Sequence, residues 1–260
     1  MHTVDPPPHS DLPQLAADMS GRLRARRPRV HCLTNAVAQN FTANVLLAAG
    51  CVPSMTISSE EIGHFVGGAN ALLVNLGTFD QERREATGIA VATASQKNIP
   101  WVLDPVFVDR APQRAAFARE LVGRGPILVR LNAAEFAALA ERPASPQAIA
   151  EYALAHKSVV AVSGETDLVS DGKRVAAIAN GHPLMARVTA MGCAGSALIA
   201  ACLSVESDPW RATAAGLLLF GVAGELAARG ANGPASFAVA FIDALSTLEA
   251  GAVIQLAQVT

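Results

Sequence analysis

A cysteine at the start of an apolar helical pattern is the first candidate for chemistry in this sequence. Gly192 and Cys193 precede a helix predicted from Gly195 to Leu203, so free backbone amides at the helix start point toward Cys193. These amides form a binding site for an anion such as phosphate, and they favour the thiolate form of the cysteine. Three interpretations remain open: a structural cysteine, a nucleophile, and a general base beside a phosphate site. The nucleophile is disfavoured, because neither His182 nor His31 lies in a signature of cysteine hydrolases.

Two carboxylates and an arginine each follow a run of apolar residues typical of a buried strand. The carboxyl ends of strands in an α/β sheet border the ligand crevice. Asp104 and Glu135 can therefore hold a hydrated Mg²⁺, and Arg130 can bind a phosphate in forked geometry. Structural interpretations stay open for both acids, since Asp104 can simply turn the chain and Glu135 can form a capping box with Asn132.

A third strand end carries a hydroxyl. Ser163 and Gly164 follow an apolar run, and a hairpin is predicted around Asp171 and Gly172. The hydroxyl and the bare backbone can contact a nucleotide phosphate, although this motif by itself is a weak signal.

The elements that must position these residues alternate along the chain. Short apolar runs predict strands at 29–33, 52–56, 71–75, 101–103, 127–129 and 159–162. Alanine-rich stretches predict helices at 40–49, 81–98, 113–121, 133–140, 146–155, 195–203, 210–229 and about 236–256. This alternation predicts an α/β fold, with a largely parallel central sheet and helices on both faces.

Composition bounds the class of protein. The 260 residues are 51% hydrophobic and 16% charged with a formal charge of -2, which indicates one globular domain over 1–260 and disfavours nucleic-acid binding. The four cysteines form no zinc-site spacing and suit a reducing cytoplasm. The uncharged stretch from Val188 to Val205 contains glycines and hydroxyls, so it is interpreted as a buried loop and helix, not a membrane span. The start of the chain has no apolar signal region, and residues 1–12 are expected to form a frayed tail.

Taken in order, the segments resemble the hydroxyethylthiazole kinases, the thiamine-salvage members of the ribokinase-like kinases. The resemblance covers roughly residues 30 to 205, and the ordered set is far more specific than any single motif. It consists of VHCLTNAVAQNFTANVLLAAG, PSM, ANALLVNLGT, VLDPV, the 130–135 segment, VSGETD, DG, GHPLM and the Gly192–Cys193 pair.

The resemblance implies a ribokinase-like three-layer sandwich and transfer of phosphate from ATP, with Mg²⁺, to the primary alcohol of 4-methyl-5-(2-hydroxyethyl)thiazole. It also implies a homotrimer with sites at subunit interfaces. The implied site residues are Cys193 as the base, Met55, Gly192 and Asn35 for the thiazole, Arg130 and Ser163 for ATP, and Asp104 and Glu135 for the metal.

The chain departs from the family pattern around the same crevice. Ala190 and Met191 stand where the family has Gly-Thr, Phe107 begins the segment that replaces a glycine-rich run, and Leu131 replaces a glycine. A Cβ at position 190 restricts positive φ, and the larger side chains are expected to crowd the site. Two alternatives follow: a kinase for another small heteroaromatic alcohol, and a non-catalytic ligand-binding relative. Retention of all the reactive side chains disfavours the second.

Overall fold

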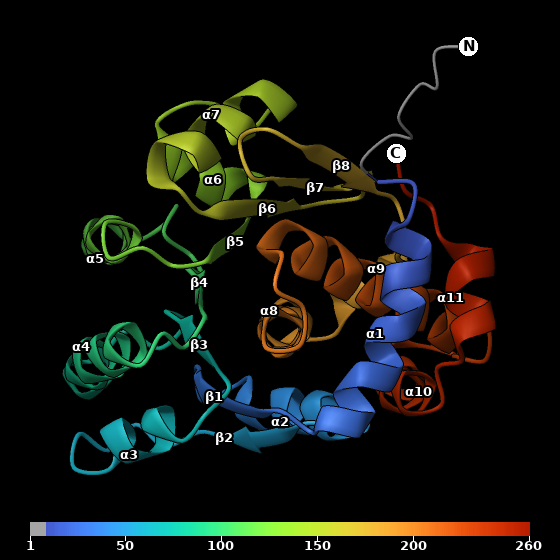
Figure 1. Cartoon of the computed structure of the whole chain (residues 1–260), viewed down its shortest axis with the longest axis horizontal. Coiled ribbons are helices and arrows are strands. Elements are labelled where there is room, and N and C mark those ends of the chain that lie inside the picture. The colour runs from blue at the N-terminus through green and yellow to red at the C-terminus, as the bar shows by residue number, and fades with distance from the viewer. Residues whose placement is uncertain (1–8) are drawn as a thin grey trace.

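The computed structural model describes residues 9–260 and arranges their strands in one eight-stranded sheet (Figure 1). In spatial order the strands are β2 (Val52–Ser54), β1 (Arg29–Leu33), β3 (Ala71–Asn75), β4 (Trp101–Asp104), β5 (Leu128–Asn132), β6 (Val159–Ser163), β7 (Asp167–Ser170) and β8 (Val175–Ile178). Neighbours from β2 to β6 pair in parallel, and β7 and β8 add an antiparallel hairpin. The predicted largely parallel sheet and the hairpin are confirmed.

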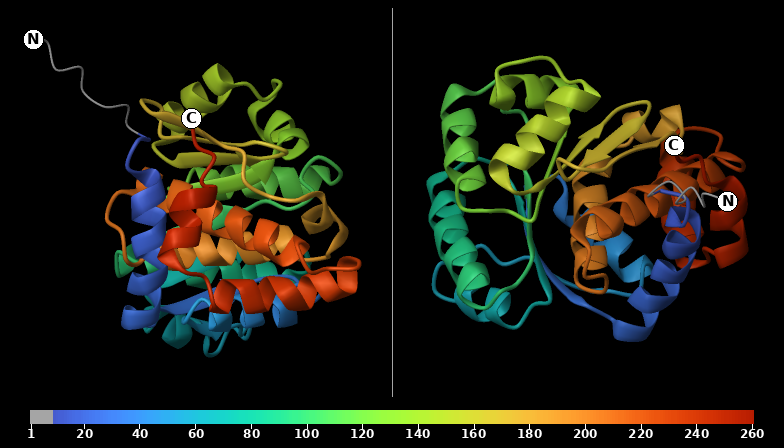
Figure 2. Two further views of the ribbon diagram at one scale, coloured as in Figure 1. Left: turned by 90° about the vertical axis from the view of Figure 1, so that its right-hand side faces the viewer. Right: turned by 45° about the horizontal axis from the view of Figure 1, so that its top comes forward.

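Helices cover both faces of this sheet (Figures 1 and 2). One face carries α3 (Ile62–Gly67), α4 (Gln81–Gln96), α5 (Pro112–Val122), α6 (Ala133–Ala140) and α7 (Pro146–His156). The other face carries α1 (Leu12–Arg26), α2 (Gln39–Ala48), α8 (Met191–Leu203), α9 (Pro209–Ala228), α10 (Pro234–Ser246) and α11 (Ala250–Leu256), with the short 3₁₀ helix η1 (Pro183–Arg187). Alternate strand residues bury in opposite layers: Leu72 and Val74 face α3–α7, whereas Ala71 and Leu73 face α8 and its neighbours. The result is a three-layer sandwich.

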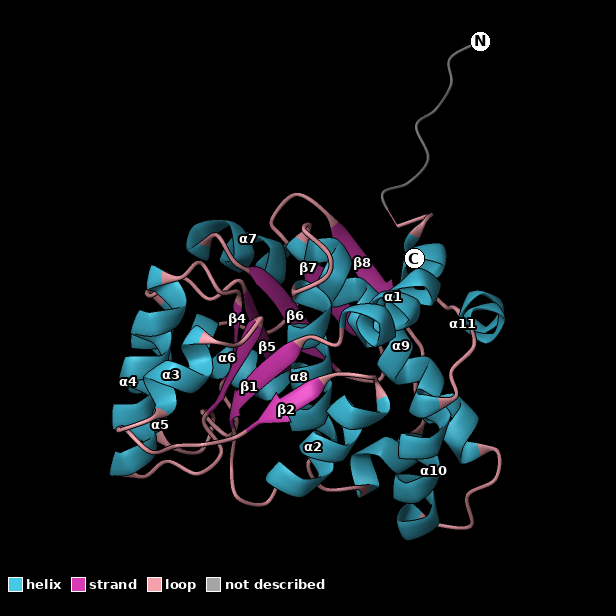
Figure 3. Ribbon diagram, turned by 60° about the horizontal axis from the view of Figure 1, so that its bottom comes forward, coloured by secondary structure: helices cyan, strands magenta, loops and turns pink. Residues whose placement is uncertain are grey.

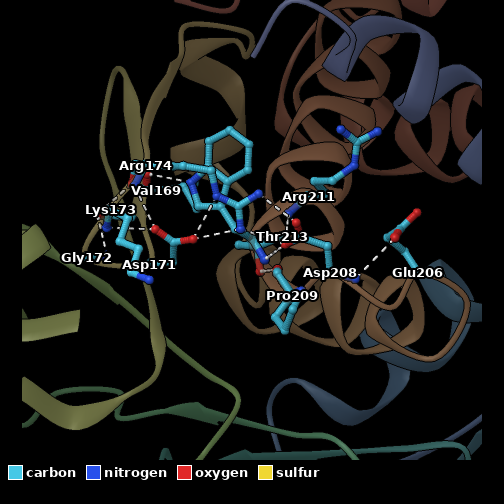
Figure 4. Close-up of polar contacts among 12 residues, drawn as sticks. Val169, Asp171, Gly172, Lys173, Arg174, Glu206, Asp208, Pro209, Arg211 and Thr213 are labelled. Carbon is cyan, nitrogen blue, oxygen red and sulfur yellow. Dashed lines mark hydrogen bonds and ion pairs between the residues drawn. The ribbon is translucent and has the colours of Figure 1, made fainter. Parts of the chain in front are cut away.

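The hairpin is fastened to the start of α9 (Figure 4). Arg174 donates two hydrogen bonds to the carboxylate of Asp208, at 2.6 and 2.9 Å, and one to Asp171 at 2.8 Å. Its guanidinium carbon lies 4.5 Å from the ring centre of Trp210. Asp208 also caps α9, because its carboxylate accepts the backbone N–H groups of Trp210 and Arg211. Ser170 pairs with Val160, near the start of β6, so this cluster lies at the amino ends of the parallel strands.

Several elements differ from those predicted, three of them with a clear reason. Helix α8 begins at Met191 and not at Gly195, so Gly192 and Cys193 belong to its first turn. The glycine and cysteine are poor helix formers, which hid the true start. The single helix predicted near 236–256 is two helices, α10 and α11, bent by 115° between them. Helix α3 was not predicted, because six residues are too short for a periodic pattern.

The apolar stretches lie inside the fold. For the stretch 188–205 the buried helix is confirmed, because every residue of α8 after Cys193 is buried, but the loop before it is not buried, since Thr189 is exposed. Helix α9 is long and apolar enough to cross a membrane, as is the bent α10–α11 pair by composition, but 78% of the apolar window of α9 is buried in the structure. Residues 1–8 of the predicted tail lie outside the described residues, and Leu12 begins α1 fully buried.

Candidate active site

Polar side chains gather where the parallel strands end. Asn75 is the last residue of β3, and the register pairs it with Asp104, the last residue of β4. In the same way Asn132, at the end of β5, pairs with Ser163 at the end of β6. Because carboxyl ends of neighbouring parallel strands lie side by side, the predicted residues Asp104 and Ser163 border one edge of the sheet.

Cys193, in the first turn of α8, joins this edge. Its Sγ lies 3.3 Å from Nδ2 of Asn75 and 3.5 Å from Nδ2 of Asn35. Asn35 Nδ2 donates to Oδ1 of Asn75 at 3.0 Å, and Asn75 Nδ2 donates to Oδ2 of Asp104 at 2.8 Å. A single amide side chain therefore connects the cysteine to the buried carboxylate.

Arg130 reaches from β5 to the start of α8. Its Nη1 donates to the carbonyl of Gly192 at 2.7 Å and to Oγ of Ser196 at 3.3 Å, and that hydroxyl donates to Asp104 at 2.9 Å. Within residues 9–260 its buried Nε has no hydrogen-bond partner. A buried guanidinium beside a helix N-terminus brings two positive groups together, an arrangement that suits an anion such as phosphate.

Glycine at position 192 leaves room for this contact. A Cβ there would lie 3.4 Å from Nη1 of Arg130, at the tight limit of ordinary contacts. Gly192 itself is exposed, so its backbone borders the open side of the edge.

The prediction that Cys193 favours the thiolate is wrong in this structure. Burial and, after it, the negative charge of Asp104 raise the pKa of Cys193 to about 12. The amides of Asn35 and Asn75 and the charge of Arg130 oppose this shift but do not cancel it. The cysteine is therefore a neutral thiol at neutral pH, because burial outweighs the positive end of the helix.

Glu135 holds two backbone segments together. The predicted capping box is confirmed: Asn132 Oδ1 accepts the N–H of Glu135 at 2.9 Å, and Glu135 Oε2 accepts the N–H of Asn132 at 2.8 Å. The other oxygen, Oε1, accepts the N–H of Phe107 at 2.9 Å. Glu135 thus joins the loop after β4 to the start of α6.

Asp104 and Glu135 fit a hydrated magnesium ion. Burial raises the pKa of both carboxyl groups, and the charge of Asp104 raises that of Glu135 as well, so a cation would relieve this repulsion. No group of three or more His, Cys, Asp or Glu side chains within 9–260 is arranged to hold a metal. Mg²⁺ does not require one, because it commonly keeps several waters and binds through one or two carboxylates and substrate phosphates.

The remaining predicted residues lie at the margins of this cluster. Ser163 is partly exposed, and its hydroxyl donates to the carbonyl of Leu131 at 3.2 Å. Met55 follows β2, the edge strand seen at the front of Figure 3, and packs partly buried against the core. The sheet order places β1 between β2 and β3, so Met55 follows a strand that lies two positions from that of Asn75.

Buried His31 fixes the segment around Met55. Its two ring nitrogens contact Oγ of Ser54 at 2.8 Å and the carbonyl of Thr56 at 3.0 Å. Desolvation lowers the pKa of His31, so the ring is neutral at neutral pH.

Sequence reasoning assigned no role to Asn75 and Ser196, which complete the cluster. Both had a signal. Asn75 is a polar residue at the end of a fully buried strand, and Ser196 lies three residues after Cys193, on the same face of the helix.

The expected crowding of the site is not found for two of the substituted residues. Met191 and Leu131 are buried in the two core layers, so neither fills the crevice. Ala190 and Phe107 adopt left-handed backbone conformations, with φ of 67° and 59°. Glycine would take these conformations without strain.

Comparisons with known proteins agree with this geometry. The sequence model described as the hydroxyethylthiazole kinase family matches residues 21–251. A probable hydroxyethylthiazole kinase of Agrobacterium fabrum is 44% identical over 245 residues, which cover 94% of each chain. A hydroxyethylthiazole kinase of Klebsiella pneumoniae is 45% identical over 246 residues, covering 90% of this chain and 95% of the relative.

Solved structures show the same fold. The hydroxyethylthiazole kinase protein from Pyrococcus horikoshii superposes with a TM-score of 0.91 at 35% identity, covering 95% of this chain and 98% of its own. The pyridoxal kinase of Staphylococcus aureus, in complex with AMP-PCP and pyridoxal, gives a TM-score of 0.59 at 14% identity, covering 76% of this chain and 88% of its own. That second likeness shows the ribokinase-like fold alone.

Proposed function

The chain belongs to the hydroxyethylthiazole kinase family, and from this membership we propose how its residues carry out the phosphorylation. The enzyme is a kinase that phosphorylates an alcohol, hydroxyethylthiazole, in thiamine biosynthesis. In our proposal ATP supplies the γ-phosphoryl group, and the primary hydroxyl of 4-methyl-5-(2-hydroxyethyl)thiazole accepts it. The whole chain acts as one kinase domain.

One observation carries this mechanism: Arg130, Asp104 and Cys193 converge on the first turn of α8. Phosphoryl transfer demands mainly positioning and neutralisation of charge on the transferred oxygens. Arg130 and the free amides of that turn supply positive groups for the phosphates. Ser163, at the end of β6, adds a hydroxyl on the same edge for the nucleotide.

Asp104 and Glu135 would hold Mg²⁺. When bound, the ion would neutralise charge on the phosphate oxygens and on both carboxylates. The chain's own contribution is to orient the two acids: Asn75 and Ser196 donate to Asp104, while the amides of Asn132 and Phe107 fix Glu135.

We assign to Cys193 the role of the base that accepts the proton of the alcohol. With a pKa of about 12 the sulfur is protonated at neutral pH, so Cys193 accepts the proton of the alcohol only in its minor thiolate form and becomes the thiol. In a loose transition state the hydroxyl becomes acidic only as the new bond to phosphorus forms, so this proton transfer to the thiolate comes late. Asn35 and Asn75 hold the sulfur in place through their amide groups.

We assign the binding of the thiazole to Met55, Asn35 and Gly192. We also propose that this binding site lies at an interface between two chains of a homotrimer. Strand β2 is an open edge of the sheet, and Met55 follows it. Val52, Leu47 and Phe65 are exposed near this edge, which suits burial against a second chain. A solution mass near that of three chains is expected, and a fully active monomer would exclude a shared site.

The cytoplasm is the proposed location, because ATP is available there and the four cysteines are unpaired in the part of the chain described. The contacts of Asp104, Arg130 and Cys193 around the first turn of α8 support a catalytic role over a non-catalytic one. A kinase for another heteroaromatic alcohol is favoured only by the half-exposed Phe107 beside the site.

A coupled assay of ADP release tests the function. We expect release that requires both the thiazole alcohol and Mg²⁺, with Asp104→Asn as a control of impaired metal binding. Turnover with a different heteroaromatic alcohol but not with the thiazole would favour the second candidate. No turnover with any alcohol would refute the proposed kinase activity.

A further inference from the structure

Two strained backbone positions border the site and have no ordinary structural explanation. In residues 9–260, six non-glycine residues have positive φ. Four of them are at helix ends, where the left-handed conformation is common: Arg27, Glu141 and Lys157 are C-caps, and Asn98 follows the C-cap of α4. The other two are Ala190, which begins α8, and Phe107, in the loop after β4. Strain that stability does not explain is a reason to look for function.

The loop around Phe107 is fixed on several sides. The N–H of Phe107 donates to buried Glu135 at 2.9 Å, and the carbonyl of Val106 accepts a hydrogen bond from Arg114 at 2.7 Å. Val108, the next residue, is buried in the core. The strained conformation is therefore held by the surrounding structure and is not a frayed loop.

The ring of Phe107 is nevertheless left in the open. Its exposed fraction is 49%, and its described partner is the guanidinium of Arg110, 5.2 Å from the ring centre. The Arg110 side chain is itself mostly exposed. The strained backbone and the exposed large apolar ring each destabilise the folded chain when no substrate is bound. Neither feature therefore serves folding.

The position of this ring is set by the metal-binding acids. The backbone N–H of Phe107 is bonded to Glu135, and Phe107 follows Asp104 by three residues. Its backbone is therefore one hydrogen bond away from a carboxylate that is assigned to the metal. A large apolar group beside the transferred phosphate can keep water away from the reacting phosphorus.

We propose that Phe107 shields the γ-phosphoryl group from water, so that the alcohol and not water accepts it. This rests on the proposed function of the site. In both reactions the bond between the γ-phosphorus and the bridging oxygen of ADP breaks. With the alcohol, a phosphorus–oxygen bond forms to its hydroxyl oxygen and the proton is released. With water, the same bond forms to the water oxygen and yields inorganic phosphate, ADP and a proton.

The test measures ADP release in the absence of any alcohol, at saturating ATP and Mg²⁺. Phe107→Ala removes the ring but keeps the Cβ and its backbone restriction, and it should raise this hydrolysis on the order of tenfold. Phe107→Leu keeps an apolar shield and should stay close to the original rate. Lys157→Gly is the matched control, because it removes a left-handed side chain at the end of α7, away from the site, and should change nothing.

A second readout is the ratio of ADP formed to thiazole phosphorylated, which should rise in Phe107→Ala. If that variant does not fold, Phe107→Gly relieves the backbone strain and gives the same two measurements. Hydrolysis and ratio equal to those of the original chain would overturn the proposal. Absence of thiazole phosphorylation in the original chain would refute the proposed function instead, and the alcohol-free measurement would still decide the role of Phe107.

Discussion

Replacement of Ala190 by glycine should stabilise the chain. Ala190 is the N-cap of α8 and has a φ of 67° and a ψ of 0°. In this left-handed region the Cβ of an L-residue approaches the following carbonyl oxygen, whereas glycine has no Cβ. The carbonyl of residue 190 accepts the first hydrogen bond of the helix, from Ala194 at 2.9 Å, and glycine would keep that bond.

The expected size follows from two opposing contributions. The left-handed conformation costs about 1–2 kcal/mol for alanine, and glycine removes this cost. The greater freedom of glycine in the unfolded chain takes back about 0.5–1 kcal/mol. The net gain in the free energy of unfolding should be about 0.5–1 kcal/mol. For a chain of this size each kcal/mol raises Tm by about 2–4 °C.

Ala111→Gly provides a matched control. Ala111 is also an N-cap without a side-chain hydrogen bond, but its φ is -136°, in the extended region. Replacing Ala111 by glycine gives the unfolded chain the same extra conformational freedom, and the preference for glycine over alanine at an N-cap is also the same. The difference between the two variants should therefore be about 1–2 kcal/mol in favour of Ala190→Gly, the cost of the left-handed conformation alone.

Urea unfolding followed by circular dichroism would measure both variants. Protein concentration must be equal throughout, because an oligomer unfolds at a midpoint that depends on it. If Ala190→Gly proves no more stable than Ala111→Gly, position 190 stores no strain, and the reasoning from its backbone angles fails.

Cys193→Ala is expected to lower kcat by about 10²- to 10⁴-fold with an unchanged Kd for ATP; a kcat within about twofold of the original would remove the proton-accepting role. Arg130→Ala should lower kcat/KM for ATP on the order of 10²-fold, whereas Arg124→Ala, which replaces an exposed arginine just after α5, should leave it unchanged. Burial lowers the pKa of His31 below 6.5, so the unfolded chain binds a proton that the folded chain does not, and stability falls as pH drops through 6.5. The urea midpoint should decrease from about pH 7.5 to about pH 5.5, and by less in His31→Gln; equal decreases would contradict this assignment.

The candidate site was only partly visible in the sequence. Asp104, Arg130 and Glu135 each follow an apolar run, and that pattern placed them near strand ends; in the structure Asp104 ends β4, whereas Arg130 lies within β5 and Glu135 in the first turn of α6. The pattern cannot show which strands are neighbours. The order β2–β1–β3–β4–β5–β6 puts Asn75 beside Asp104 and leaves Met55 two strands from Asn75.

Charge was the property that local sequence predicted worst. The helix start at Cys193 indicates a thiolate when considered alone, yet burial and Asp104 raise the pKa to about 12. The sequence likewise predicted that the large side chains of Met191 and Leu131 would crowd the site, but both are buried in the core. Solvation and side-chain direction depend on what packs around a residue, and that information is distributed over the whole chain.

The sequence by itself determined the α/β class, most element positions and the family, because these depend on periodic burial and on an ordered set of short motifs. Only the tertiary structure decided the hydrogen-bonded path from Cys193 through Asn75 to Asp104, and the strain at Phe107 and Ala190. The reason is physical: contacts between residues far apart in the chain are set by the order and register of strands, and backbone angles at loops are set by the groups that hold them.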